Sequence, residues 1–163
     1  MESSAFDNDT SLGTVEGKIR HIVSTMNEDV EYMFCNWAQA NVSIDSVTKP
    51  TIVYVLPPSG NLSFSWRDVK DRPNTQIAFV CVTDFDFDGT ENDGIIEAMK
   101  RLAIRFVRAL NNSGLFTTID GDVLYQVLYD HLDQNVTGVV LTLSLEEVDG
   151  VSICSETTRK NNQ

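Results

Sequence analysis

The stretch Thr75–Thr83, which reads TQIAFVCVT, decides the fold that this sequence predicts. Its centre, IAFVCV, is apolar at every position. A strand with one face in water would alternate apolar and polar residues, whereas a continuous apolar run is typical of a strand covered on both faces. The stretch therefore predicts a buried strand.

The first helix is expected to begin at Thr14, a residue type that suits an N-cap. The helical spacing of its apolar residues is clear to about Met26. Beyond that point the boundary stays open, because Asn27–Asp29 could break the helix and Glu31–Asn36 could pair as a short strand.

A second helix is expected to end before Gly114, since glycine commonly follows the last helical turn. Three arginines, Arg101, Arg105 and Arg108, would form a basic ridge along it. Glu97 could pair with Arg101 within the helix, or the ridge could bind the acidic loop of a neighbouring copy. The apolar stripe of this helix consists of Ile95, Ile96, Met99, Leu102, Ala103, Phe106, Val107 and Leu110.

Further strands are expected on both sides of the second helix. Thr51–Leu56 is rich in β-branched residues and stops at a Pro-Pro turn, and Asn61–Trp66 alternates apolar and polar residues. The charged segment Arg67–Asn74 is predicted to be a loop. Trp66 could belong to a hairpin that packs on its own domain or to an arm that projects. A C-terminal hairpin is expected, with Val123, Tyr125, Val127 and Tyr129 on one face of its first strand and Val139, Leu141, Leu143 and Leu145 on one face of its second.

The predicted fold class is α+β, with a mostly antiparallel sheet of four to five strands and two helices packed on one face. A single domain is expected over residues 14–150. Residues 1–13 are interpreted as a polar N-terminal arm and residues 151–163 as a polar C-terminal tail.

Composition and charge exclude several classes of protein. The formal net charge is −12, and residues 83–163 hold fourteen acids against six bases. An acidic surface repels phosphate, so specific nucleic-acid binding is not expected. No apolar run is long enough to span a membrane and no secretory signal is visible. Cys35, Cys81 and Cys154 are interpreted as free thiols in a reducing compartment.

One motif has the pattern of a calcium loop. Asp84, Asp86 and Asp88 occupy its first, third and fifth positions, and Gly89 its sixth. The twelfth position, where a bidentate Glu is needed, is Ile95. The favoured interpretation is a solvated acidic loop before a helix, and a calcium-binding module is the alternative.

No catalytic residues are predicted, and the chain is not expected to be an enzyme. G-x-S-x-G, P-loop and G-x-G-x-x-G motifs are absent. His21 and His131 lie far apart in sequence, and Cys81 lies in the most apolar strand, where a thiol is inert. An enzyme with a pair of carboxylates that no motif marks is a third, weaker hypothesis.

Residues 50–148 contain several segments that together resemble one protein family. These are VLPPSG at 55–60, D-x-P-N at 71–74, IAFVCVTDFDFDG at 77–89, the helix ENDGIIEAMKRLAIRFVRALNNSG, and the GD-x-x-YQV-x-YD and N-x-TG-x-x-L segments after it. They resemble small proteins of the structural modules of tailed bacteriophages in gut bacteria. The order of elements also resembles the tail-terminator or tail-completion fold.

The resemblance implies a virion protein of the phage neck or tail, assembled in the host cytoplasm. It would form a homo-oligomeric ring, a head–tail connector or tail terminator, around the DNA channel and contact other neck or tail proteins. The short, ring-stacked tails of crAss-like phages are a fitting setting. The family implies neither catalytic residues nor a cofactor.

Overall fold

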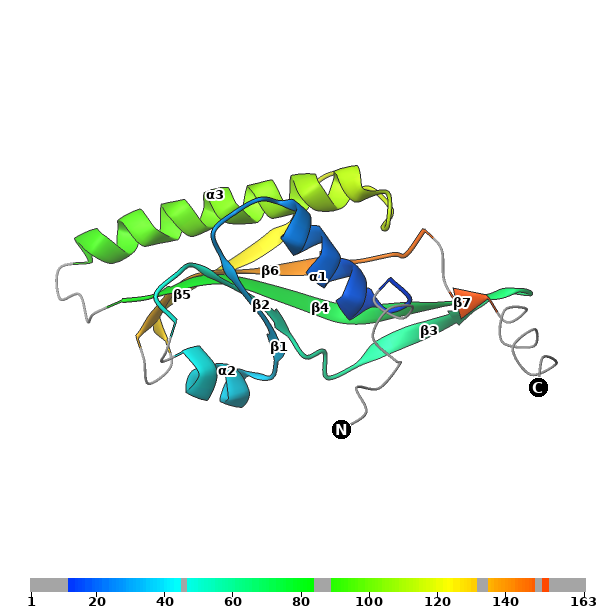
Figure 1. The fold of residues 1–163 in the computed structure, drawn as a ribbon, viewed down its shortest axis with the longest axis horizontal. Coiled ribbons are helices and arrows are strands. Elements are labelled where there is room, and N and C mark those ends of the chain that lie inside the picture. The colour runs from blue at the N-terminus through cyan, green and yellow to red at the C-terminus, as the bar shows by residue number, and fades with distance from the viewer. Residues whose placement is uncertain (1–11, 45–46, 84–88, 132–134, 149–150, 153–163) are drawn as a thin grey trace, which may run out of the picture.

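The computed structural model describes residues 12–44, 47–83, 89–131, 135–148 and 151–152. Three helices and seven strands are found in this part of the chain (Figure 1). The helices are α1 (Val15–Thr25), α2 (Trp37–Ser43) and α3 (Thr90–Ser113). The strands are β1 (Glu31–Cys35), β2 (Thr51–Val55), β3 (Gly60–Phe64), β4 (Asp68–Val82), β5 (Leu124–His131), β6 (Val136–Ser144) and β7 (Val151–Ser152).

The sheet is built around β4, which is 15 residues long. Its strand order is β1-β2-β4-β6-β5, in which β1 and β2 are parallel and the other pairs antiparallel. The C-terminal part of β4 pairs with β2 and β6, whereas its N-terminal part pairs with β3 and β7. One strand therefore belongs to the main sheet at one end and to a small outer sheet at the other.

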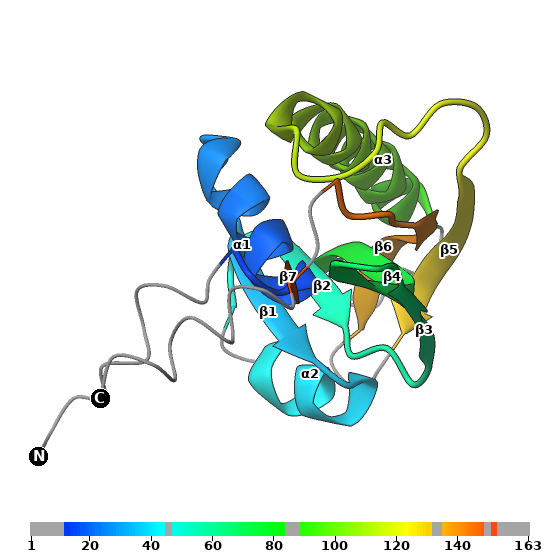
Figure 2. The ribbon, with the colours of Figure 1, turned by 90° about the vertical axis from the view of Figure 1, so that its right-hand side faces the viewer.

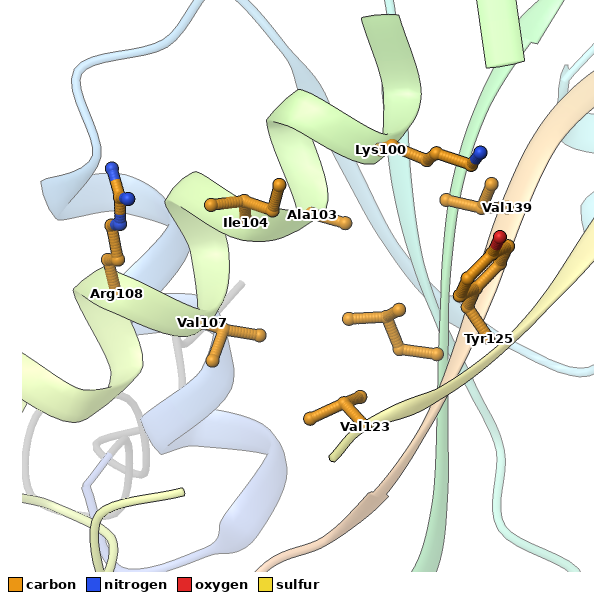
Figure 3. A pocket seen from close by; sticks show the side chains of 9 residues that line it. Lys100, Ala103, Ile104, Val107, Arg108, Val123, Tyr125 and Val139 are labelled. Atoms are coloured by element: carbon orange, nitrogen blue, oxygen red, sulfur yellow. The ribbon is translucent and has the colours of Figure 1, made fainter. Parts of the chain in front are cut away.

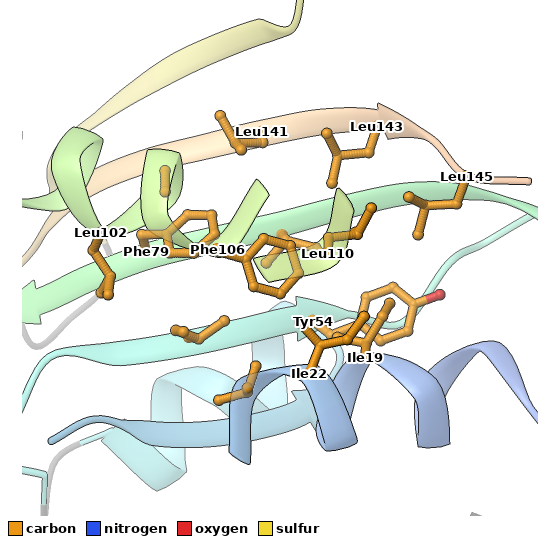
Figure 4. Packing of buried hydrophobic residues seen from close by; sticks show 14 of the residues in the cluster. Ile19, Ile22, Tyr54, Phe79, Leu102, Phe106, Leu110, Leu141, Leu143 and Leu145 are labelled. Carbon is orange, nitrogen blue, oxygen red and sulfur yellow. The ribbon is translucent and has the colours of Figure 1, made fainter. Parts of the chain in front are cut away.

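Helices cover both faces of the main sheet. Figures 1 and 2 show α1 and α3 on one side and α2 on the other. Ile77 and Phe79 of β4 face the first side, where the Phe79 and Phe106 rings lie 5.5 Å apart (Figure 4). Ala78 and Val80 face the second, together with Ile44. Side chains alternate along a strand, so the run IAFVCV serves two cores at once.

The helix ends follow their sequence signals. The backbone N–H of Gly17 donates to Thr14 Oγ1 at 3.0 Å, which confirms the predicted N-cap. Gly114 closes α3 with φ of 69°, a conformation that favours glycine. Asn36 caps α2 by accepting a hydrogen bond from the Gln39 backbone at 2.8 Å.

The structure confirms the α+β class and the two predicted helices on one face, and it corrects three details. Residues 68–74 are strand rather than loop, because residues 69–73 pair with β3. Asp68 pairs with β7 and Asn74 with β6. A third helix, α2, covers the second face. Its seven residues include one buried side chain, too few to produce a helical pattern. The sheet is mixed, because β1 returns parallel to β2, and the described residues hold seven paired strands rather than four to five, because β3 and β7 add to the N-terminal part of β4.

A buried ion pair ties α1 to the opposite end of the chain. Lys18 Nζ lies 2.7 Å from Glu147 Oε1, and these side chains are 6% and 4% exposed. The other Glu147 oxygen accepts a hydrogen bond from the Asp71 backbone N–H at 3.1 Å. The carboxylate thus joins α1, β4 and the segment after β6. Removing one partner would leave a buried charge uncompensated.

We expect Lys18→Met to destabilise the fold by about 3–5 kcal/mol, because it strands the Glu147 carboxylate without its cation. Lys49→Met is the matched control, since Lys49 pairs with Asp29 at the surface, where an ion pair is screened by water and contributes little to stability. Urea denaturation of both variants measures the difference. Equal losses would show that the buried pair does not hold α1 in place.

Candidate functional site

A β-hairpin formed by β3 and the N-terminal part of β4, here called the arm (residues 60–73), carries exposed apolar side chains. Leu62 is 62% exposed, Phe64 74% and Trp66 89%. Leu62 and Phe64 share one face, since they are two residues apart on β3. Trp66 lies in the turn that joins the two strands. The tip of the arm therefore presents an apolar surface to water.

The base of the arm is held tightly. Gly60 lies opposite Pro73, where a Cβ on residue 60 would approach Pro73 Cα to 2.8 Å, so the close approach of the strands requires glycine. The Asn74 backbone N–H donates to Ser59 O at 3.0 Å, next to this glycine. At the turn end of the arm, β7 pairs with Asp68 and Val69 on the other edge of β4. Of the two interpretations of Trp66, this geometry favours the projecting arm.

A groove lies between α3 and the edge strand β5. Its volume is about 390 Å³. It exists because the buried stripe of α3 sits over β4 and β6, so the helix leaves β5 partly uncovered. Figure 3 shows the walls converging from the helix and from β5 and the segment before it. The apolar lining residues are Ala103, Ile104, Val107, Val123, Tyr125, Val139 and Leu141.

Two basic residues, Lys100 and Arg108, are among those that line this groove. Figure 3 shows Lys100 reaching toward Tyr125, whereas the Arg108 side chain extends away from β5. Lys100 Nζ donates to Glu97 Oε1 at 2.9 Å and lies 5.1 Å from the centre of the Tyr125 ring. The hydrogen bond to Glu97 raises the pKa of Lys100 and lowers the pKa of Glu97, so both remain charged. The groove therefore combines apolar walls with a basic rim on an otherwise acidic protein.

Strand β5 forms one edge of the main sheet and is apolar on both faces. Tyr125, Val127 and Tyr129 share one face, as predicted; this face lies toward α3, and each of the three side chains is 44–49% exposed. Leu124, on the other face, is 64% exposed. Sequence reasoning placed Val123, Tyr125, Val127 and Tyr129 on a strand face but did not identify a surface site there. The sequence does contain a signal for an apolar surface, because LYQVLY (residues 124–129) has apolar residues at both odd and even positions and therefore on both faces of the strand.

The basic ridge is only partly free for contact with another molecule. Arg105 Nε lies 2.5 Å from Glu28 Oε1, in the segment after α1, so this arginine ties α3 to α1. Glu97 pairs with Lys100 instead of Arg101. Arg108 is exposed and faces the groove on one side and, on the other, a second hollow between α1 and α3.

We expect Arg105→Glu to lower stability by about 1 kcal/mol or less, because it replaces an exposed ion pair with like charges. The exchange Arg105→Glu with Glu28→Arg should restore the stability, and thermal melting of the single and double variants measures it. We expect the oligomeric state to remain unchanged. Loss of assembly in both variants would instead place the ridge in an interface.

The predicted metal ligands Asp84, Asp86 and Asp88 lie outside the described residues. Within the described ranges, no group of three or more His, Cys, Asp or Glu side chains is close enough to hold a metal. Cys35 and Cys81 are free thiols, and burial raises the pKa of both. His21 is exposed on α1, and the side chain of His131 lies outside the described part.

The calcium alternative is tested directly by thermal melting. A native-state site filled at a hundred times its Kd raises the free energy of unfolding by about 2.7 kcal/mol. Because we favour a solvated loop, we expect millimolar calcium to leave the melting temperature unchanged, with magnesium as the ionic control. A rise with calcium that disappears in Asp86→Asn would establish the metal site.

Comparison of the chain with protein families, with curated proteins and with solved structures finds no match. In the described residues, no helix has the length and apolar character needed to cross a membrane. Functional inference therefore depends on the surfaces described above and on the resemblance of residues 50–148.

Proposed function

We propose that this protein is a ring-forming structural subunit of the neck or tail of a tailed bacteriophage, a head–tail connector or tail-terminator-like protein. The observation that carries the proposal is the presence of two separate exposed apolar surfaces, the arm and the groove with its neighbouring β5 edge. Exposed apolar patches of this kind mark protein–protein contacts. Two different patches on one chain suit a head-to-tail assembly.

The exposed apolar side chains of the arm would stabilise a contact between subunits if they were buried in it. Burying a large apolar side chain is worth about 1.5–3 kcal/mol, so Leu62, Phe64 and Trp66 together represent several kcal/mol. Phe64 and Trp66 lie at the turn end of a paired hairpin and Leu62 lies at the middle of β3, and none of the three belongs to the buried core clusters. Contact with another subunit would use this free energy.

The net negative charge of the protein suits the wall of a DNA channel. A net charge of −12 disfavours adhesion of DNA, and an acidic channel wall lets a polyanion pass without binding it. No cofactor, specific nucleic-acid binding or membrane contact is part of the proposal. The other partners would be neck or tail proteins of the virion, assembled in the bacterial cytoplasm.

The phage setting and the tail-terminator-like assignment of the α+β fold depend on the resemblance of residues 50–148. The described elements by themselves carry only the α+β arrangement, with α1 and α3 on one face of a mixed sheet. Assembly itself is supported independently, by the exposed surfaces.

Native mass spectrometry of the purified full chain tests the proposal. We expect closed oligomers of one dominant copy number, and negative-stain images should show rings with a central opening. The expected reason is a head-to-tail contact whose rotation closes on itself.

A chain that stays monomeric up to high micromolar concentration, and remains so with salt present to screen its charge, would overturn this function. Open filaments would support head-to-tail contact but contradict the ring.

A further inference from the structure

We propose that the arm of one copy binds in the groove between α3 and β5 of the next copy, with Phe64 and Trp66 as the anchoring side chains. This inference depends on the proposed function, because it names the contact by which the subunits assemble. It concerns a second copy of the chain rather than an unrelated partner, and three properties of the two surfaces support that choice.

The first property is chemical complementarity. The arm offers one aliphatic and two aromatic side chains, and the groove offers apolar walls formed by residues such as Ile104, Val107 and Val123. The Lys100 ammonium at the rim complements aromatic rings, since a cation is attracted to the negative face of an indole. Tyr125, already under Lys100, shows that the rim holds an aromatic ring in this way.

The second property is the distance between the two surfaces within one copy. Leu141, which lines the groove, pairs with Ile77 of β4. The turn that holds Trp66 lies just before Asp68, the first residue of the same strand. From residue 77 to residue 68 the strand covers about 30 Å at ~3.3 Å per residue. The paired, pinned hairpin cannot fold back over that distance. Its contact must be with another copy, which makes the interface heterologous.

The third property is the available area. Large aromatic side chains bury about 150–250 Å² each, so Phe64 and Trp66 together would supply roughly half of the ~800 Å² per partner in a standard interface. The edge of β5, which among the described strands pairs with β6 alone, runs beside the groove and could contribute the remainder. The two surfaces together are large enough for a stable contact.

Complementation of two variants tests the inference. The arm variant Phe64→Ser/Trp66→Ser removes the anchors, and the groove variant Ile104→Glu places a charge on the groove wall at a half-exposed helix position. Each variant alone should be monomeric, with at least a tenfold weaker self-association. An equimolar mixture should form a dimer and nothing larger, because one intact arm and one intact groove remain in each pair.

Val42→Ser is the matched control, since Val42 is 79% exposed on α2 and lies outside both surfaces. It should assemble like the unchanged chain. Thermal melting checks that every variant is folded. As a second measurement, a photo-reactive phenylalanine at position 66 should crosslink to peptides of α3 or β5 of another copy.

The outcomes separate the two proposals. If the unchanged chain assembles but the arm and groove variants assemble equally well, or the crosslink reaches other elements, this contact is wrong while the proposed function stands. If both variants are monomeric and their mixture is too, the interface is not arm-in-groove. If the unchanged chain is monomeric, both proposals fail.

Discussion

The constraint on which the structure depends is that β4 must bury both of its faces. Ile77, Ala78, Phe79 and Val80 are completely excluded from water, and the backbone between them is paired on both edges, to β2 and to β6. Apolar residues on both faces require cover on both, which α1 and α3 provide on one side and α2 on the other. Loss of either cover would expose one face of this apolar strand to water, which is unfavourable.

The same strand produces both candidate surfaces. It continues beyond the main sheet, and its N-terminal part pairs with β3 and β7, which creates the arm. The apolar stripe of α3 packs on β4 and β6 and therefore does not also cover β5. The uncovered edge strand β5 forms one wall of the groove. Both surfaces therefore result from the way the neighbouring elements pack around the long strand β4.

Charge has two roles in this protein. Inside, the Lys18–Glu147 pair fixes α1 against β4 and the chain beyond β6, at a position where either charge alone would be costly. On the surface, the arginines of the predicted basic ridge have different roles. Arg105 joins α3 to the segment after α1, whereas Arg108 borders the groove. Spacing along a helix identified these residues, but partners from distant segments decide what each one does.

The sequence by itself determined the elements whose signals are local and periodic. The N-cap at Thr14, the stripe of α3, the end at Gly114 and the doubly buried run in β4 could all be predicted, because each depends on neighbours within a few residues. Tertiary structure alone decided that residues 68–74 pair as strand, that α2 covers the second face, and that Leu62, Phe64 and Trp66 project into water. An alternating strand has the same pattern whether its apolar face meets a core or solvent. The physical reason is that exposure depends on which distant elements cover a surface, and no local period carries that information.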